Sequence, residues 1–269
     1  MFVIDVPIVH SNIILLELGL KMKAVIIAAG CGSRLQSRHN GMPKTLLTVN
    51  NQSIIDIILK GIVLSGIKEV VIVLGYKADM LENYLLANTP DSLKIEFSRN
   101  PDWQLSNGIS VLCAEEFINT DEEFVLLMSD HIFETRMLTA TVEAPISKNE
   151  ALLAIDFNLS EIPDLEDGMK VKCKKTDDDC KWIITGLSKS YSEYSAIDCG
   201  MFKLNKGFFR VLKNCIEKGK DSLSDACNIY AETGGMIGLD ISGSKWIDLD
   251  TPEMFSFENI INKIAGTDQ

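Results

Sequence analysis

The sequence predicts an α/β fold, namely a Rossmann-like, doubly wound and mostly parallel mixed sheet in a single domain. The chain has 269 residues, 46% of them apolar, which is enough to bury one large core. Continuous apolar runs of strand length recur along it, as in strands that are covered on both faces. Stretches with helical spacing separate these runs, and this alternation is typical of parallel β-α-β units.

The alternation is most regular in the first half of the chain. The predicted strands there are 24–29, 69–75, 93–97 and 124–130. The predicted helices are 53–65, 79–86 and 108–117. Because parallel strands end at one edge of a sheet, we expect ligands beyond the carboxyl ends of these strands.

The second half mixes strands and helices less regularly. The predicted strands are 151–156, 169–174, 182–187, 196–204 and 245–250. The second and third of them read as a hairpin, and the last is expected to close the sheet. Helices are predicted near 206–217, near 222–232 and from about Thr251, where Pro252 suits a first helical position. No repeat or linker divides the chain, so one domain is expected.

The first 21 residues are predicted to be an appendage, because the first core strand opens at Met22. The apolar stretch 11–20 is too short to span a bilayer and contains Glu17. Asp5 is the first charge, whereas a signal peptide would start with basic residues. We therefore expect no membrane insertion through this segment.

Composition argues against several classes of partner. Lys and Arg number 26 and Asp and Glu 38, giving a formal net charge of −12. Such a surface disfavours nucleic acid and anionic membranes, so a phosphate site would have to be a local exception. The seven cysteines are odd in number and form no C-x-x-C pair, which favours reduced thiols in a cytoplasmic protein.

That local exception lies after the first strand. The segment Ala28-Ala29-Gly30-Cys31-Gly32-Ser33-Arg34-Leu35 is followed by Pro43-Lys44. Glycines at such a turn let backbone N–H groups approach phosphate oxygens. No Asp or Glu occurs from Leu18 to Ile55, although five basic residues do. A phosphate-binding loop explains this better than an ordinary turn with a basic face.

Two other phosphate-binding motifs fit this loop poorly. A dinucleotide fingerprint needs a third small residue where Leu35 stands, and an acid about 20 residues further on. A P-loop needs the pattern G-x-x-x-x-G-K-[ST], which does not occur here.

Acidic residues at two strand ends predict a magnesium site. Asp130 ends one apolar strand, and Asp248 and Asp250 end another. If both strand ends face the same crevice, Asp130 could share one Mg²⁺ with Asp248 or Asp250. Taken singly, such acids are more often helix caps, and Asp250 before Thr251 is the clearest case.

The loop motif with Pro43-Lys44 resembles the signature of nucleoside-triphosphate transferases of the sugar-nucleotide and alcohol-phosphate type. The resemblance extends over nearly all of 23–265. Within this family the chain is most similar to CTP:inositol-1-phosphate cytidylyltransferases, and more distantly to phosphocholine cytidylyltransferases. The segments that carry this similarity are 106–110, 127–131, 197–202 and 246–251.

The resemblance implies that residues 22–135 bind the nucleotide. Arg34 and Lys44 would be catalytic, with Lys44 at the α-phosphate, and Asn107 and Gly108 would contact the pyrimidine base. Asp130 with either Asp248 or Asp250 would hold Mg²⁺; we slightly prefer Asp250, which lies at the mouth of the crevice. The loop residues that would wrap the triphosphate are Ala28, Ala29, Gly30, Cys31, Gly32 and Ser33.

The resemblance likewise implies that residues 136–269 bind the acceptor, with Lys189 on its phosphate. Asp198 and Gly200 would line the acceptor pocket, and Lys170 matches another family lysine. The gap from Arg34 to Pro43 is longer than in the family, Cys31 replaces a commoner Leu or Met, and residues 1–21 have no counterpart.

The expected chemistry is a single in-line displacement. An acceptor phosphate or phosphonate oxygen attacks the α-phosphorus of CTP, and pyrophosphate leaves. A phosphate dianion needs no general base, so catalysis reduces to positioning and charge neutralisation by Mg²⁺, Lys44 and Arg34. A proton-transfer role for His131 is the less favoured interpretation.

Three functions stay open from the sequence. The first is a cytidylyltransferase acting on a phosphorylated small molecule. The second is a guanylyl- or uridylyltransferase that makes a nucleotide sugar or a cofactor precursor. The third is a non-catalytic nucleotide sensor, which the intact set of candidate catalytic residues disfavours. A homodimer is compatible with the sequence, which does not determine the oligomeric state.

Overall fold

The computed structural model describes residues 22–35, 41–176 and 181–265. The predicted appendage, residues 1–21, lies outside the described residues. Within the described ranges, no helix has the length and apolar character needed to cross a membrane.

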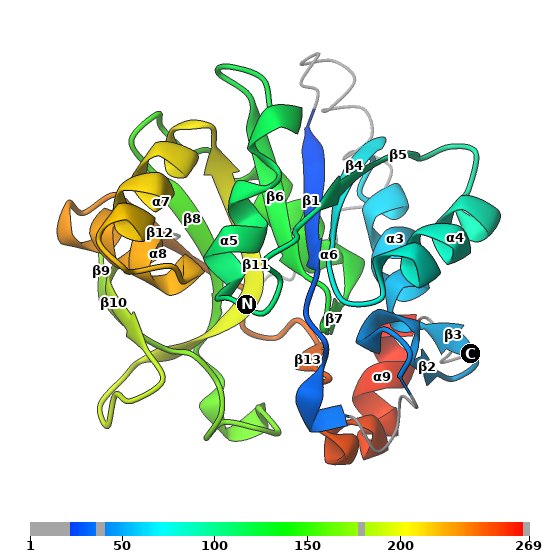
Figure 1. Cartoon of the computed structure of the whole chain (residues 1–269). Coiled ribbons are helices and arrows are strands. Elements are labelled where there is room, and N and C mark those ends of the chain that lie inside the picture. The colour runs from blue at the N-terminus through cyan, green and yellow to red at the C-terminus, as the bar shows by residue number, and fades with distance from the viewer. Residues whose placement is uncertain (1–21, 36–40, 177–180, 266–269) are drawn as a thin grey trace.

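One nine-stranded mixed sheet runs through the molecule, in the order β5-β4-β1-β6-β11-β8-β12-β10-β9 (Figure 1). The first four strands in this order are parallel, and they are β5 (Lys94–Arg99), β4 (Glu69–Leu74), β1 (Lys23–Ala28) and β6 (Glu123–Met128). The others are β11 (Ala196–Asn205), β8 (Ala151–Asp156), β12 (Met236–Asp240), β10 (Lys181–Ser188) and β9 (Lys170–Lys175). Antiparallel pairing dominates among these, although β12 is parallel to β8. The predicted mixed α/β fold is confirmed.

The sheet is covered on both faces, as the continuous apolar runs predict. In β1, Ala24, Ile26 and Ala28 belong to one core and Val25 and Ile27 to the other, because successive side chains point to opposite faces. The first core is covered by α3 (Ile54–Leu64), α4 (Ala78–Asn88), α6 (Thr135–Glu143) and α9 (Glu258–Ala265). The second is covered by α5 (Asn107–Leu112), α7 (Gly207–Glu217) and α8 (Leu223–Glu232), which lie together in front of the sheet in Figure 1.

Side-chain caps fix where two of these helices begin. Ser53 precedes α3 and accepts a hydrogen bond from the backbone N–H of Asp56. Ser222 and Asp225 form a reciprocal capping box at the start of α8. The short hairpin of β2 (Thr48–Val49) and β3 (Gln52–Ser53) leads directly into α3.

The predicted helix 108–117 is shorter in the structure. Helix α5 ends at Leu112, and a separate 3-10 turn, η3, follows at Glu115–Phe117. The carbonyl of Cys113 accepts a hydrogen bond from the Ser98 hydroxyl at 2.7 Å, and the N–H of Phe117 bonds to Ala114 instead. The contact with Ser98 on β5 therefore interrupts the regular helix.

The prediction that 245–250 closes the main sheet is wrong. Strand β13 (Trp246–Asp248) pairs with β7 (His131–Phe133) in a separate antiparallel ribbon. The place beside β8 is taken by β12, which the sequence patterns did not predict; α6 was missed as well. The chain then continues through the 3-10 helix η5 (Pro252–Ser256) into α9. The ribbon brings the end of β13 next to the turn that follows β6.

Candidate active site

The loop after β1 has the backbone that its glycines suggested. Gly32 has φ +60°, and a Cβ there would lie 2.9 Å from Cβ of Lys44. A larger residue at 32 would therefore be strained and would push Lys44 aside. An added Cβ at Gly30 would meet nothing within 4 Å, so backbone there is open to a ligand. The loop continues into the 3-10 turn η1 (Ser33–Leu35), which carries Arg34.

Lys44 is a buried cation surrounded by acids. It opens the 3-10 turn η2 (Lys44–Leu46) and is 6% exposed. Its ammonium lies 3.0 Å from Asp130 Oδ2 and pairs with Asp250 as well. Burial lowers the pKa of Lys44, but attraction to Asp130, Asp250 and Asp248 outweighs it, and the net pKa is raised. Lys44 therefore stays charged.

Arg34 joins the loop to two segments of the second half of the chain. Its guanidinium pairs with Asp250 and with Asp167, which belongs to the segment between β8 and β9. Burial lowers its pKa, and these two carboxylates more than reverse the effect. Asp250 thus accepts from both Lys44 and Arg34, and it does not cap the following 3-10 helix, whose N-cap residue is Thr251 and has no side-chain cap.

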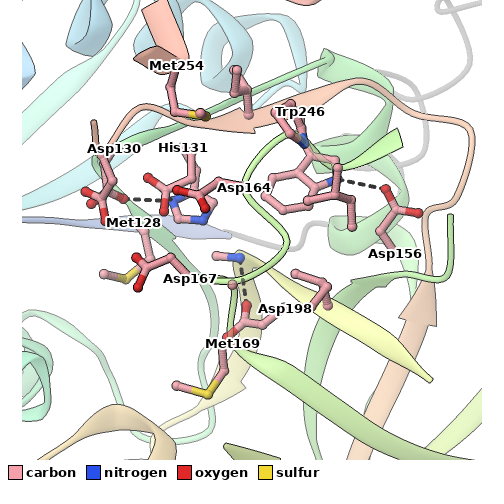
Figure 2. A pocket seen from close by; sticks show the side chains of 18 of the residues that line it. Met128, Asp130, His131, Asp156, Asp164, Asp167, Met169, Asp198, Trp246 and Met254 are labelled. Atoms are coloured by element: carbon pink, nitrogen blue, oxygen red, sulfur yellow. Dashed lines mark hydrogen bonds and ion pairs between the residues drawn. The ribbon is translucent and has the colours of Figure 1, made fainter. Parts of the chain in front are cut away.

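Asp130, His131 and Asp248 form the group whose donor atoms fit a metal ion. One ligand atom from each lies within 4.8 Å of the others. His131 Nδ1 is 2.7 Å from Asp130 Oδ1 and 4.0 Å from Asp248 Oδ1 (Figure 2). Asp248 Oδ1 is buried and has no hydrogen-bond partner. A buried carboxylate oxygen without a donor, beside a second carboxylate, fits the hard oxygen ligands that Mg²⁺ takes.

Burial and the neighbouring charges shift the pKa values of these three groups in different directions. Burial raises the pKa of Asp248 to about 7, with His131 opposing and Asp130 and Asp250 adding to the rise. Burial also acts to raise the pKa of Asp130, but Lys44 and His131 hold it well below its ordinary value. Burial lowers the pKa of His131, yet Asp248, Asp130 and Asp198 raise it to about 9. A protonated His131 donates to Asp130, which does not favour it as a general base.

A set of contacts behind His131 fixes its ring. The rings of His131 and Trp246 stack with centroids 5.8 Å apart and planes at 1°. Trp246 Nε1 donates to Asp156 Oδ2 at 2.9 Å (Figure 2). Gly200 has φ +69°, and a Cβ there would come within 2.7 Å of the His131 ring. Gly200 is therefore needed for the close approach of β11 to this ring.

Two cavities meet at the acidic residues. One, of about 290 Å³, is lined by the loop after β1, with Arg34 and Lys44 on its wall. The other, of about 260 Å³, lies on the side of β8–β11. Asn107, Met128, Asp130 and Asp250 line both of them. The two cavities therefore share a wall that carries the candidate catalytic charges.

The predicted acceptor residues gather at the second cavity, with one exception. Lys189, Asp198 and Gly200 line it. Burial raises the pKa of Asp198 to about 6. The backbone N–H of Gly200, which donates to Asp198 at 2.7 Å, and the nearby His131 both act to lower this pKa. Lys170 is instead 8% exposed and donates to the carbonyl oxygens of Glu166, Lys189 and Gly168 at 2.7, 3.0 and 3.4 Å.

Ala29 and Gly108, two of the residues predicted for the nucleotide site, do not line the first cavity. Ala29 is buried in the sheet core. Gly108 is needed for packing, because a Cβ there would lie 2.3 Å from the carbonyl oxygen of Asp221. Asn107, in contrast, lines both cavities, and its Oδ1 accepts from the backbone N–H of Leu223 at 2.9 Å. Their ligand contacts stay predictions.

Trp103 and Asp167 are among the lining residues that sequence reasoning missed. Trp103 lines the loop-side cavity, with Tyr76 against its ring at 5.4 Å between centroids. Asp167 lines the other cavity and pairs with Arg34 and Lys189. Asp167 stands in an acid-rich stretch, 161–167, that looks like an ordinary solvated loop, so no local signal set it apart.

Comparison with known proteins identifies the family of this chain. A family model described as "Nucleotidyl transferase" matches residues 23–264, and the chain belongs to that family. A "Bifunctional IPC transferase and DIPP synthase" of Aquifex aeolicus is 29% identical over 241 residues, which cover 86% of this chain and 49% of the relative. A "Bifunctional protein GlmU" of Methanococcus vannielii is 26% identical over 254 residues, covering 91% and 57%. The chain spans about half the length of the curated relatives it matches.

Solved structures share the fold. The inositol-1-phosphate CTP transferase from T. maritima superposes with a TM-score of 0.77 at 22% identity, over 91% of this chain and 96% of that one. A UDP-glucose pyrophosphorylase from Acinetobacter baumannii gives a TM-score of 0.72 at 17% identity, over 90% and 93%. The resemblance seen in the sequence motifs is confirmed at the level of the nucleotidyl transferase family.

Proposed function

We propose that this nucleotidyl transferase moves CMP from CTP to a small phosphorylated alcohol or phosphonate, with Mg²⁺, and releases pyrophosphate. The observation that carries this proposal is the wall shared by the two cavities. A nucleotide in one cavity and an acceptor in the other would meet at Asp130 and Asp250, next to the Lys44 ammonium. Direct transfer of a group from one ligand to the other requires the two ligands to meet, and they would meet at the residues that line both cavities.

The nucleotide side supplies fixed positive charge. Lys44 is held in place by burial, and Arg34 reaches the same carboxylate, Asp250, from the loop. Cations that are already in position before the reaction can stabilise the charge that develops on phosphate oxygens, because the protein does not have to reorganise around it. The open backbone at Gly30 would let N–H groups approach the triphosphate.

Asp130 and Asp248 are the residues we propose to hold Mg²⁺, with Asp250 beside them. The buried, unpartnered oxygen of Asp248 supports this choice over Asp250, whose carboxylate already pairs with two cations. The ion would supply a Lewis acid that neutralises phosphate charge. His131 orients Asp130 through its 2.7 Å contact, and Trp246 and Gly200 hold the His131 ring.

Lys189 and Asp198 are two of the charged residues that line the acceptor side. Lys189 would bind the phosphate of the acceptor, whose dianion attacks without a general base. Asp198 would accept a hydrogen bond from the rest of the acceptor. The relatives named IPC transferase and the fold shared with an inositol-1-phosphate CTP transferase support a phosphorylated polyol. The alternative is a uridylyl- or guanylyltransferase, and the shared fold with UDP-glucose pyrophosphorylase favours the uridylyl case.

A pyrophosphate-release screen tests the proposal. The four nucleoside triphosphates are each incubated with inositol 1-phosphate, phosphocholine, 2-aminoethylphosphonate and glucose 1-phosphate, with and without Mg²⁺. We expect turnover with CTP, with one of the first three acceptors, and only with the metal. Turnover confined to UTP and glucose 1-phosphate would establish the alternative. No pyrophosphate from any pair would favour a nucleotide sensor.

The proposal also covers the cellular location of the protein and its oligomeric state. The described cysteines are all free thiols, which supports a cytoplasmic protein. A homodimer is tested by sedimentation, which would give a mass of twice 29.8 kDa.

A further inference from the structure

A single carboxylate, Asp167, connects Arg34 and Lys189, two of the cations that the proposed reaction would use for phosphate. Its Oδ2 accepts from the Arg34 guanidinium, and its Oδ1 lies 3.2 Å from Lys189 Nζ. Arg34 belongs to the nucleotide loop and Lys189 follows β10 on the acceptor side. Asp167 lines the acceptor cavity with Lys189, and Figure 2 shows its side chain among those around that cavity.

The position of Asp167 is built into the fold by a buried lysine. Lys170 directs its ammonium to the carbonyl oxygens of Glu166 and Gly168, on either side of Asp167, and to that of Lys189. A Lys ammonium has three donors, and these three acceptors use them. Lys170 therefore fixes the backbone of Asp167 relative to that of Lys189, although neither side chain is itself buried.

The contacts of Asp167 imitate those of a phosphate group. Arg binds carboxylate and phosphate through the same planar fork of N–H donors. A carboxylate between Arg34 and Lys189 thus offers its two oxygens where a phosphoryl group would offer two of its own. The side chains are 46% exposed for Arg34, 40% for Asp167 and 52% for Lys189. Ion pairs this exposed are weak, so an incoming anion can displace the carboxylate.

We infer that Asp167 is a positioning residue that holds Arg34 and Lys189 when no phosphate is bound and yields them to the phosphates of the substrates. This inference rests on the proposed function for the role of Lys189, but its test does not depend on the identity of the base or of the acceptor. Its consequence is specific. Asp167 competes with phosphate for the two cations, so its removal tightens the binding of a phosphate ligand. A residue needed only to fold this loop would weaken that binding when removed.

The test is the affinity for pyrophosphate, measured by calorimetry on the full chain at fixed Mg²⁺. We expect Asp167→Asn to lower the Kd about two- to fivefold, the range that an exposed ion pair contributes. The matched control is Glu166→Gln, which removes the same charge from an exposed neighbour and should leave the Kd unchanged. Asp167→Glu restores a carboxylate and should return the Kd towards that of the unaltered chain.

A double-mutant cycle separates competition from a general charge effect. With Arg34→Gln in place, Asp167→Asn should tighten binding less, because only Lys189 is then left for Asp167 to release. An unchanged or raised Kd in Asp167→Asn, or an equal effect of Glu166→Gln, would overturn the inference. A chain that binds no pyrophosphate would overturn it together with the proposed phosphate site. Activity with a nucleotide other than CTP, but with the Asp167 effect intact, would leave it standing and refute only the cytidine assignment.

Discussion

Lys44 Nζ lies 3.0 Å from Asp130 Oδ2, so a buried cation meets a proposed metal ligand directly at the carboxyl edge of the sheet. The two residues come from positions 86 apart in the chain, one from the turn η2 and one from the end of β6. The pair keeps both groups charged, since each moves the pKa of the other in that direction. The nucleotide and the metal would therefore be bound next to charges that are already in place.

Replacing Lys44 should affect turnover more than nucleotide binding. Lys44→Ala removes a cation where charge moves in the transition state, so we expect kcat to fall about a hundredfold or more while the Kd for CTP rises much less. Single-turnover kinetics and calorimetry measure the two quantities. A loss confined to the Kd, with normal kcat at saturation, would contradict a role in the transition state.

The three acids should differ in their magnesium dependence. Asp130→Asn and Asp248→Asn each remove a proposed ligand and should raise the Mg²⁺ concentration for half-maximal activity at least about tenfold. Asp250→Asn removes the partner of two cations, so it should lower kcat with a smaller change in the metal requirement. Metal titrations on each variant decide this. The reverse result for Asp248 and Asp250 would place the ion at Asp250, as the sequence alone slightly favoured.

The nucleotide preference should be visible without an acceptor. If Asn107 faces a pyrimidine, CTP with Mg²⁺ should raise the Tm by about 5–10 °C at a hundred times its Kd, and ATP or GTP by less at the same concentration. Thermal unfolding with each nucleotide gives this comparison. Equal shifts with all four nucleotides would contradict the cytidine assignment.

A chain that begins at Met22 should fold and turn over normally. Met22 is buried next to β1, and the family match begins at residue 23. Circular dichroism, the Tm and kcat of the truncated chain test this. An insoluble or inactive product would show that residues 1–21 complete the core or a subunit interface.

The buried cysteines should resist alkylation in the folded protein. Burial raises the pKa of the Cys199 and Cys227 thiols well above the ordinary value, so little thiolate forms at neutral pH. Iodoacetamide at pH 7.5, followed by peptide mass spectrometry, should leave both unmodified in native buffer and modify them in guanidinium chloride. The half-buried Cys31 on the loop provides the internal comparison. Rapid native modification of Cys199 would contradict its burial in β11.

Much of the fold followed from local patterns. The strand β1 and its loop were predicted because a continuous apolar run and a glycine turn are properties of adjacent residues, and burial on both faces confirms that pattern. The strand β12, with glycines before it and within it, carries too weak a pattern to be found. It pairs with β8 in the main sheet, whereas β13 pairs with β7 in the separate ribbon.

The sequence by itself determined the phosphate-type loop, the family and the acids at the two strand ends, since these depend on residue types at short spacing. Only the tertiary structure decided which partners each of these acids has. The β7–β13 ribbon sets Asp248 beside Asp130 and His131, and it leaves Asp250 facing Lys44 and Arg34. Asp167 likewise lies near Lys189 because Lys170 bonds to the backbone carbonyls of Glu166 and Lys189. Such contacts join residues far apart in the chain, and electrostatic interactions depend on distance in space rather than on separation in sequence.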